Sequence, residues 1–221
     1  MTEHYKKILQ CPLFHGIHEV DLPHLLPCLK AFTKTYEKNE IIFLAGTTIH
    51  YTCVVLQGSV QIVYEDILGN RTIFGNVGTG ELFGETFSFF QQEPLPVSVI
   101  SNEESLILYL DCGGILTTCS STCKFHHQLI ENMLKIFARK NIFLNKKIRY
   151  LSKRTTREKL LAYLSDEATS SKETIFSISF SRQELADFLC VERSAMSTEL
   201  NKLKKEGILD FHKNQFRFKN S

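Results

Sequence analysis

The sequence predicts an α+β protein with three consecutive parts: a domain of antiparallel strands, one long helix, and a small helical domain that ends in a hairpin. Short apolar runs between glycine turns predict the strands. A heptad pattern free of Gly and Pro predicts the long helix, and a capping box before two short amphipathic segments predicts the last part. We place the three parts at residues 1–123, 124–151 and 152–221.

The predicted strands begin after an apolar segment at residues 13–29. They are the runs 41–44, 54–56, 60–64, 72–74, 97–100 and 105–110, and turns that contain glycine separate most of them. A helical interpretation would place these glycines inside helices, at about 1 kcal/mol each relative to alanine. Short, regularly spaced strands are instead typical of an antiparallel barrel or sandwich.

Composition excludes several classes of protein. The 221 residues are 43% hydrophobic and 23% charged, which is ordinary globular usage and argues against disorder or a fibrous chain. No apolar run approaches the roughly 18 residues of a membrane helix, and no apolar segment follows the first residues as it does in a secretory signal. Seven cysteines, an odd number, predict mostly reduced thiols and a cytoplasmic location.

Charge is divided unevenly along the chain. Residues 1–123 hold six Lys and Arg against 13 Asp and Glu, a net charge of −7, whereas residues 124–221 hold 20 against 11, a net charge of +9. A basic C-terminal part fits a nucleic-acid partner, because neutralised phosphates release counterions. Long helices with solvated Lys and Arg would give the same asymmetry.

One glycine-rich stretch, at residues 78–86, indicates either a ligand site or a plain turn. Gly78, Gly80 and Gly84 lie within seven residues of one another, so the backbone can turn tightly and expose N–H groups to an anion. The stretch is neither a P-loop nor a dinucleotide fingerprint.

The long helix carries the pattern of a parallel coiled-coil homodimer. The expected interface residues are Leu134, Asn141 and Ile148 at a positions and Ile130, Phe137 and Leu144 at d positions, with Leu151 at the next d. An asparagine at an a position pairs across a dimer and fixes its register. We expect a second apolar line, Met133, Ile136 and Phe143, to pack on the strand domain. The alternative is a core helix in a monomer.

The C-terminal part predicts a helix-turn-helix with a wing. Ser181 and Glu184 form a capping box before a helix at residues 182–189, and Cys190 and Val191 make the turn to a helix at 192–205. Gly207 is expected to end that helix, and a hairpin follows at 208–211 and 215–218. The exposed side chains of the second helix suit a DNA major groove: Glu192, Arg193, Ser194, Ser197, Thr198, Asn201 and Lys202. A protein-binding helical hairpin is the alternative.

This order of parts resembles the Crp/Fnr family of bacterial transcription regulators over nearly the whole chain. The motifs that carry the resemblance are LFHGI (13–17), LQGSV (56–60), GELFGE (80–85), TTREKLL (155–161), SRQELA (181–186) and VERSAMS (191–197). The resemblance implies an antiparallel β-roll, or jelly-roll, of the cyclic-nucleotide-binding type, a dimer helix and a winged helix-turn-helix. It also implies an inverted-repeat operator in double-stranded DNA, an effector, and RNA polymerase as a further candidate partner.

The resemblance assigns roles to particular residues. Ser181, Arg182 and Gln183 would contact phosphates, Arg193 would read a guanine with Glu192 and Ser194 beside it, and His212 would meet phosphate from the wing. Thr198 stands where relatives often carry Arg. In the effector domain Gly84 and Glu85 match the residues that hold a ribose, whereas residues 95–99 lack the expected Arg-Ser pair. The residues expected around the effector are Gly84, Glu85, Thr86, Pro96, Val97, Ile142 and Phe143. We expect no tight binding of cyclic AMP and assign no cofactor.

Metal, haem and redox chemistry remain open from the sequence. No Cys-x₂-Cys is present, which disfavours an iron–sulfur cluster, and we assign no metal ligand. Cys112, Cys119 and Cys123 lie near His126 and His127, so a metal or redox role stands beside that of ordinary buried thiols. His50, His126 and His127 are candidate haem ligands or surface histidines. The alternative function is a haem-based or thiol-based redox sensor whose last helices bind a protein. No catalytic motif is found, and an enzyme is not expected.

Overall fold

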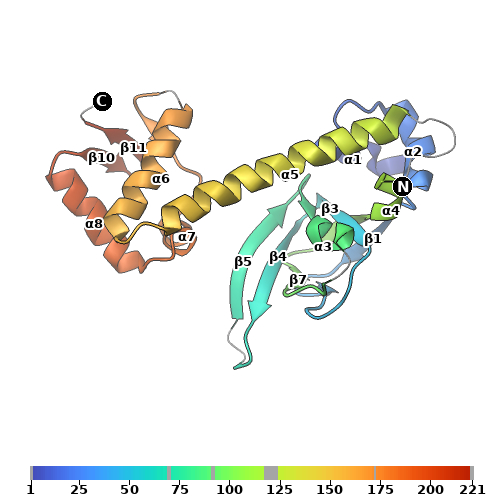
Figure 1. The fold of residues 1–221 in the computed structure, drawn as a ribbon, viewed down its shortest axis with the longest axis horizontal. Helices are drawn as coiled ribbons and strands as arrows, with labels where there is room; N and C mark the ends of the chain where they lie inside the picture. The colour runs from blue at the N-terminus through green and yellow to red at the C-terminus, as the bar shows by residue number, and fades with distance from the viewer. Residues whose placement is uncertain (1, 69–70, 91–92, 117–123, 172, 220–221) are drawn as a thin grey trace. The chain divides into compact units, whose positions relative to one another are not determined.

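The computed structural model describes residues 2–68, 71–90, 93–116, 124–171 and 173–219. The chain forms two compact units, Met1–Phe137 and Ala138–Ser221, and helix α5 (Lys124–Leu151) belongs in part to each (Figure 1). The α+β class predicted from the sequence is confirmed. Among the described residues, no helix combines the length and apolar character needed to cross a membrane.

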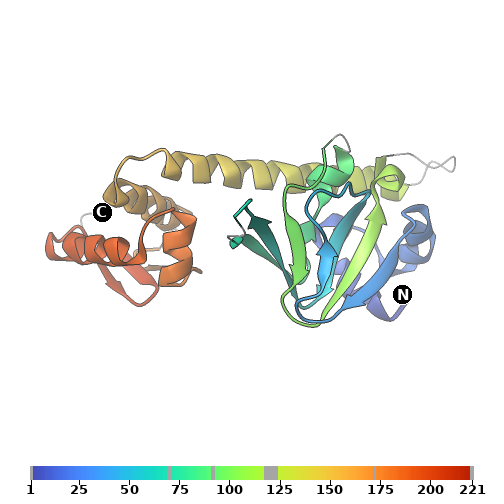
Figure 2. The same ribbon diagram turned by 90° about the horizontal axis from the view of Figure 1, so that it is seen from below.

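The first unit is built on two antiparallel four-stranded sheets (Figure 2). One sheet has the order β1 (Phe32–Tyr36), β8 (Ser105–Asp111), β3 (Tyr51–Gln57), β6 (Leu82–Phe83). The other has the order β2 (Ile41–Phe43), β7 (Ser98–Ser101), β4 (Ser59–Glu65), β5 (Arg71–Gly78).

Strand β3 explains how the core of this unit is divided. Side chains alternate between the faces of a strand, and both faces of β3 are covered, so its sequence is apolar almost throughout. Cys53 and Val55 belong to a cluster with residues of both sheets, and Val60 and Val99 are among its members from the other sheet. Val54 and Leu56 belong to a second cluster with the N-terminal helices and the start of α5.

The first unit also contains several short helices. They are the 3₁₀ turns η1 (Thr2–His4), η2 (Pro12–Phe14) and η3 (Glu19–Asp21) and the helices α1 (Tyr5–Leu9), α2 (Leu22–Cys28), α3 (Glu85–Phe89) and α4 (Cys112–Leu116). Asn132 of α5 is buried, and its amide nitrogen donates to the carbonyls of Leu13 (2.8 Å) and His15 (2.7 Å). These bonds fasten the first half of α5 to η2 and to the residue that follows it.

The second unit packs three helices, together with the last part of α5, against a small sheet. Its elements are α6 (Thr156–Ser171), β9 (Phe176–Ser177), α7 (Arg182–Phe188), α8 (Arg193–Lys205), β10 (Leu209–His212) and β11 (Gln215–Phe218), with the sheet order β10-β11-β9. Leu185, Ala186 and Leu189 lie in one core cluster with Met196 and Leu200, as the apolar spacing predicts. Small Ala186 is buried in this cluster, to which both α7 and α8 contribute.

Two predictions about the long helix have different outcomes. Met133 and Ile136 are buried in the core of the first unit, as expected. The packing predicted for Phe143 is wrong: its ring is half exposed and contacts Phe188 of α7, with centroids 5.9 Å apart. Lys147, one turn further along α5, also lies over the Phe188 ring. Heptad spacing shows which residues share a stripe but not which unit that stripe meets.

Candidate nucleic-acid interface

Helix α7 begins with the predicted capping box. The Ser181 hydroxyl accepts from the Glu184 N–H at 3.3 Å, and the Glu184 carboxylate accepts from the Ser181 N–H at 2.7 Å. These bonds lower the pKa of Glu184, so its carboxylate stays charged at the positive end of the helix. In an α-helix the first N–H groups have no partner within the helix, and the start of a helix therefore favours an anion.

The turn between α7 and α8 has the form of a Schellman motif. The Val191 N–H donates to the Ala186 carbonyl at 3.0 Å and the Cys190 N–H to the Asp187 carbonyl at 3.1 Å. Cys190 takes a left-handed conformation, φ +50°, which side chains disfavour. Helix α8 ends in the same bond pattern around Gly207, φ +74°, where glycine meets the requirement without strain.

Helix α8 has a buried stripe and an exposed polar face. Met196, Leu200 and Leu203 are buried on the inner side. Glu192 is the N-cap and Arg193 the first helical residue, and both are exposed together with Ser194 and Thr198. The outer positions at this end of α8 are Arg193, Ser194, Ser197, Thr198 and Asn201, with Ser197 half buried. The Thr198 hydroxyl donates to the Ser194 carbonyl, and the Asn201 amide to that of Ser197.

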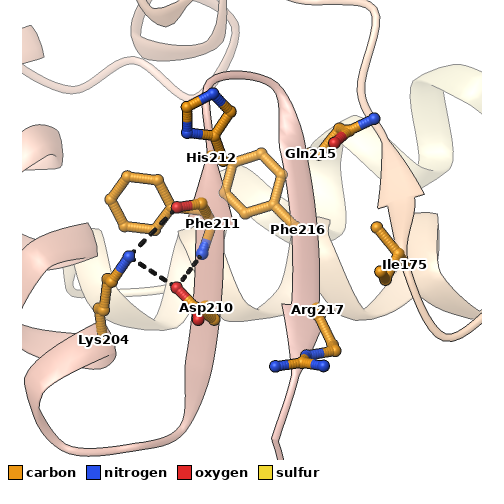
Figure 3. Close-up of a pocket in the computed structure, with 8 residues that line it drawn as sticks. All are labelled: Ile175, Lys204, Asp210, Phe211, His212, Gln215, Phe216 and Arg217. Atoms are coloured by element: carbon orange, nitrogen blue, oxygen red, sulfur yellow. Dashed lines mark hydrogen bonds and ion pairs between the residues drawn. The ribbon is translucent and has the colours of Figure 1, made fainter.

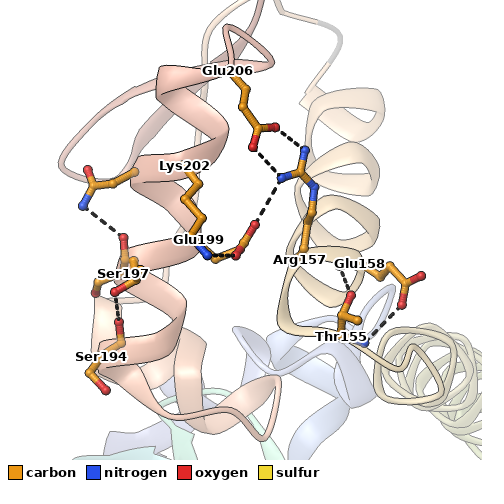
Figure 4. A network of polar contacts seen from close by, with 10 residues as sticks. Thr155, Arg157, Glu158, Ser194, Ser197, Glu199, Lys202 and Glu206 are labelled. Atoms are coloured by element: carbon orange, nitrogen blue, oxygen red, sulfur yellow. Dashed lines mark hydrogen bonds and ion pairs between the residues drawn. The ribbon is translucent and has the colours of Figure 1, made fainter.

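A charged network joins α8 to α6 (Figure 4). The Arg157 guanidinium of α6 donates to both carboxylate oxygens of Glu206, one of them at 3.0 Å, and to Glu199 at 3.3 Å. Lys202 also approaches Glu199, at 3.5 Å. The hydrogen bonds to Glu206 raise the pKa of Arg157 and lower that of Glu206. The network links α6 to α8, and sequence analysis missed it because the partners lie 42 and 49 residues from Arg157.

The hairpin of β10 and β11, Leu209–Phe218, is the wing. A shallow pocket of about 370 Å³ lies against it (Figure 3), lined by Ile175, Lys204, Asp210, Phe211, His212, Gln215, Phe216 and Arg217. The Lys204 ammonium is 2.7 Å from the Asp210 carboxylate and lowers the pKa of that group. His212, predicted to meet phosphate, and Arg217 are exposed at this surface.

The three residues predicted to meet phosphate at the start of α7 lie in different environments. Ser181 and Gln183 are exposed, and the Gln183 amide donates to Asp187 at 2.9 Å. Arg182 is half buried and donates to the Lys213 carbonyl of the wing at 2.6 Å. The structure therefore brings the start of α7, the exposed face of α8 and the wing into one unit.

The predicted dimer seam lies on a helix with exposed apolar side chains. Leu134, Leu144 and Ile148 are 64%, 55% and 64% exposed. Asn141 is exposed, and its side-chain oxygen accepts from Asn145 at 2.6 Å. Ile130 and Phe137 are half buried, and the Phe137 ring contacts Phe89 of α3. Isolated surface leucines are ordinary, but a row of them along one helix indicates an interaction surface.

The residues expected around an effector belong to both compact units, five of them to the first and two to the second. Gly84, φ +77°, precedes α3, and a Cβ there would lie 3.0 Å from Ile49, so this turn requires glycine. Glu85 is buried at the start of α3 and Thr86 beside it is exposed. Before β7, Pro96 is exposed and Val97 buried. Ile142 and Phe143 are both exposed on α5, in the second unit.

The candidate metal and redox residues are described only in part. Cys119 and Cys123 lie outside the described residues, and Cys112 begins α4. Within the described ranges, no group of three or more His, Cys, Asp or Glu side chains is placed to hold a metal ion. His50 and His127 are exposed. The interpretation of His126 as a surface histidine is wrong: the residue is buried, and its Nδ1 has no hydrogen-bond partner in the described part of the chain.

A two-sheet sensory domain followed by a capped helix-turn-helix and a wing defines a DNA-binding regulator. Two family models match the chain: the cyclic nucleotide-binding domain over residues 33–121 and the Crp-like helix-turn-helix domain over residues 158–220. The chain belongs to the Crp/Fnr family of transcription regulators, and it combines a DNA-binding domain with an effector-sensing domain.

Solved structures with the same fold cover most of the chain at low identity. The catabolite activator protein of Thermus thermophilus is 22% identical, with 94% of this chain and 93% of that one covered and a TM-score of 0.54. CprK in complex with OCPA is 14% identical, with 90% and 89% covered and a TM-score of 0.69. The c-di-GMP-responsive regulator CLP of Xanthomonas campestris is 17% identical, with 88% and 96% covered and a TM-score of 0.58. A comparison with curated protein sequences finds no match.

Proposed function

We propose that the chain acts as a homodimer that binds an inverted repeat in double-stranded DNA through two copies of α8. The observation that carries this proposal is the exposed Arg193 at the first position of α8, next to a turn and a capped α7 that leave this end of the helix uncovered. An arginine at the tip of a recognition helix can donate two hydrogen bonds to one guanine, a contact that distinguishes base pairs. Ser194, Ser197 and Thr198 offer hydroxyls beside it, and Glu192 a carboxylate.

The experiment is genomic footprinting followed by binding titrations on the protected site. Two helices about 34 Å apart enter successive major grooves, so protection should cover an inverted repeat. Arg193→Ala should weaken binding by about 1–3 kcal/mol and relax specificity at one base position of each half-site. Arg139→Ala, at an exposed site on α5, is the control and should leave binding unchanged. Protection without an inverted repeat, or equal binding by the Arg193→Ala and control variants, would contradict the proposal.

Dimerisation through α5 is part of the same proposal. Leu134, Leu144 and Ile148 are apolar and exposed in the single chain, and they share the heptad stripe of Asn141. Pairing two such stripes removes these side chains from water and lets the two asparagines bond across the axis. In a symmetric dimer each substitution on the stripe acts twice.

We further propose that an effector other than cyclic AMP controls the dimer. Residues 95–99 carry no arginine, so a cyclic phosphate buried near Val97 would lack the cation that offsets several kcal/mol of desolvation. Proteins with this fold are described with unlike ligands, OCPA for CprK and c-di-GMP for CLP. Glu85, buried at the start of α3 beside the tight turn at Gly84, is the residue most suited to hold a polar group of the effector.

Calorimetry with cyclic AMP tests this part of the proposal. The wild-type protein should show no dissociation constant in the low micromolar range. Val97→Arg would create an Arg-Ser pair with Ser98 and should tighten binding of the nucleotide, because the added guanidinium neutralises its phosphate. Low-micromolar binding by the wild-type chain would refute the proposal.

A further inference from the structure

We propose that Arg182 is a positioning residue that fastens the wing to the start of α7, so that contact between the wing and DNA depends on it. The proposal rests on the DNA-binding function proposed above. It gives Arg182 a role different from the phosphate contact that the family resemblance implies.

The guanidinium of Arg182 contacts the wing in three places. Its Nη2 donates to the Lys213 carbonyl at 2.6 Å. Its central carbon lies 4.9 Å from the ring centroid of Phe216 and 5.3 Å from that of Phe211. Phe211 and Phe216 are cross-strand partners whose centroids are 5.8 Å apart, so one cation covers the aromatic pair that joins the two strands of the wing.

The same geometry withdraws Arg182 from solvent. Its Nη1 is buried and has no hydrogen-bond partner in the described part of the chain. Burial lowers the pKa of Arg182, although a guanidinium remains charged. One terminal nitrogen is thus shielded and the other is bonded to the wing. A bidentate bond to phosphate needs two accessible nitrogens on one edge of the fork.

The wing turn needs such an attachment. Lys213 has φ +50°, a left-handed conformation that is unfavourable for a residue other than glycine. The carbonyl of Lys213 is held by Arg182, and the carbonyl of Asn214 accepts from the Ile178 N–H at 3.0 Å. The two residues of the turn are therefore held from two sides. His212, the residue expected to meet DNA from the wing, directly precedes them.

Gln183 supplies a matched comparison. It is the next residue of α7 and is also expected to meet phosphate, but it is exposed and its amide bonds to Asp187 of its own helix. Arg182→Met keeps most of the aliphatic stem and removes the guanidinium. Gln183→Met removes a polar head group of the same helix without touching the wing.

The first test uses amide hydrogen exchange in the full chain without DNA. Arg182→Met should speed exchange across residues 209–218 by tenfold or more, with the exchange of α6 and α8 unchanged. Gln183→Met should exchange as the wild type does. Arg182→Lys should give partial rescue, because an ammonium can bond to the Lys213 carbonyl but cannot cover both rings as a planar fork does. Wild-type exchange in the wing of both Arg182 variants would overturn the proposal.

The second test uses a double-mutant cycle on DNA with His212→Ala. Arg182→Met should raise the dissociation constant for DNA about tenfold. The double variant Arg182→Met with His212→Ala should have about the same dissociation constant as the weaker-binding of the two single variants. The fold-changes that Gln183→Met and His212→Ala cause in the dissociation constant should instead multiply, as they do for independent contacts. Multiplicative effects of Arg182→Met and His212→Ala, or unchanged DNA affinity of Arg182→Met, would overturn the proposal. If the wild type itself binds no DNA, the proposed function fails, while exchange in the DNA-free chain still decides whether Arg182 holds the wing.

Discussion

Truncation of Leu144 should weaken the proposed dimer by a predictable amount. Full burial of a leucine side chain is worth about 1.5–3 kcal/mol. Leu144 is 55% exposed in the single chain, so burial of the exposed part contributes on the order of 0.8–1.6 kcal/mol per protomer. A symmetric dimer contains two copies, and the total of about 1.5–3 kcal/mol corresponds to roughly a 10- to 150-fold weaker association.

Leu44 provides the matched control for this measurement. It is the same residue type with nearly the same exposure, 54%, and it lies outside the helix, after β2. Leu144→Ala and Leu44→Ala should both fold, since each side chain already meets water. Sedimentation equilibrium over a concentration series should give a larger dissociation constant for Leu144→Ala and a wild-type value for Leu44→Ala. Equal dissociation constants for the wild type and Leu144→Ala would refute the assignment of the seam.

Three further predictions concern backbone strain, thiol reactivity and alkaline stability. Cys190 and Gly207 both have a left-handed backbone, which glycine adopts most readily. In denaturant titrations Cys190→Gly should therefore raise the free energy of unfolding by about 1 kcal/mol, and Gly207→Ala should lower it by about the same amount. Changes of the opposite sign would contradict this prediction. Burial raises the pKa of Cys11 to about 12, so iodoacetamide at pH 8 should label exposed Cys190 and spare Cys11; peptide mass spectrometry that finds equal labelling would count against it. Burial, followed by the hydrogen bond to Asp166, raises the pKa of Tyr150 to about 12, above the unfolded value near 10. The folded state therefore holds this proton more tightly, and the stability advantage over Tyr150→Phe should be complete below about pH 10 and shrink as the pH rises toward 12; an advantage that is the same at pH 8 and pH 11 would exclude this linkage.

The helix-turn-helix could be predicted closely because its signals are local. The Ser181–Glu184 capping box and the left-handed Gly207 each depend on a few neighbouring residues, and the observed helices begin and end within a residue or two of the expected positions. The buried stripe of Met196, Leu200 and Leu203 follows from helical periodicity alone.

Features that depend on distant parts of the chain escaped prediction. Strand β1, Phe32–Tyr36, alternates threonine and lysine at the edge of its sheet, and β6 and β9 have two residues each, so none shows an apolar run. The partners of Arg157 and Arg182 come from other elements that only the fold brings close. Periodicity placed Phe143 on a stripe but did not identify Phe188 as its neighbour.

The exposed middle of α5 has a consequence for how the protein responds to dilution. Every residue from 138 to 146 is exposed, so this segment gains little from burial in the single chain. In proteins most helical stability comes from the packing of one face of the helix, so a stretch with little packing is only weakly stabilised. If a second chain covers the segment, the stability of the helix there depends on the fraction of dimer and therefore on protein concentration. At low protein concentration the middle of α5 would then lose its helical structure before either compact unit unfolds. At high concentration this part of α5 would stay helical.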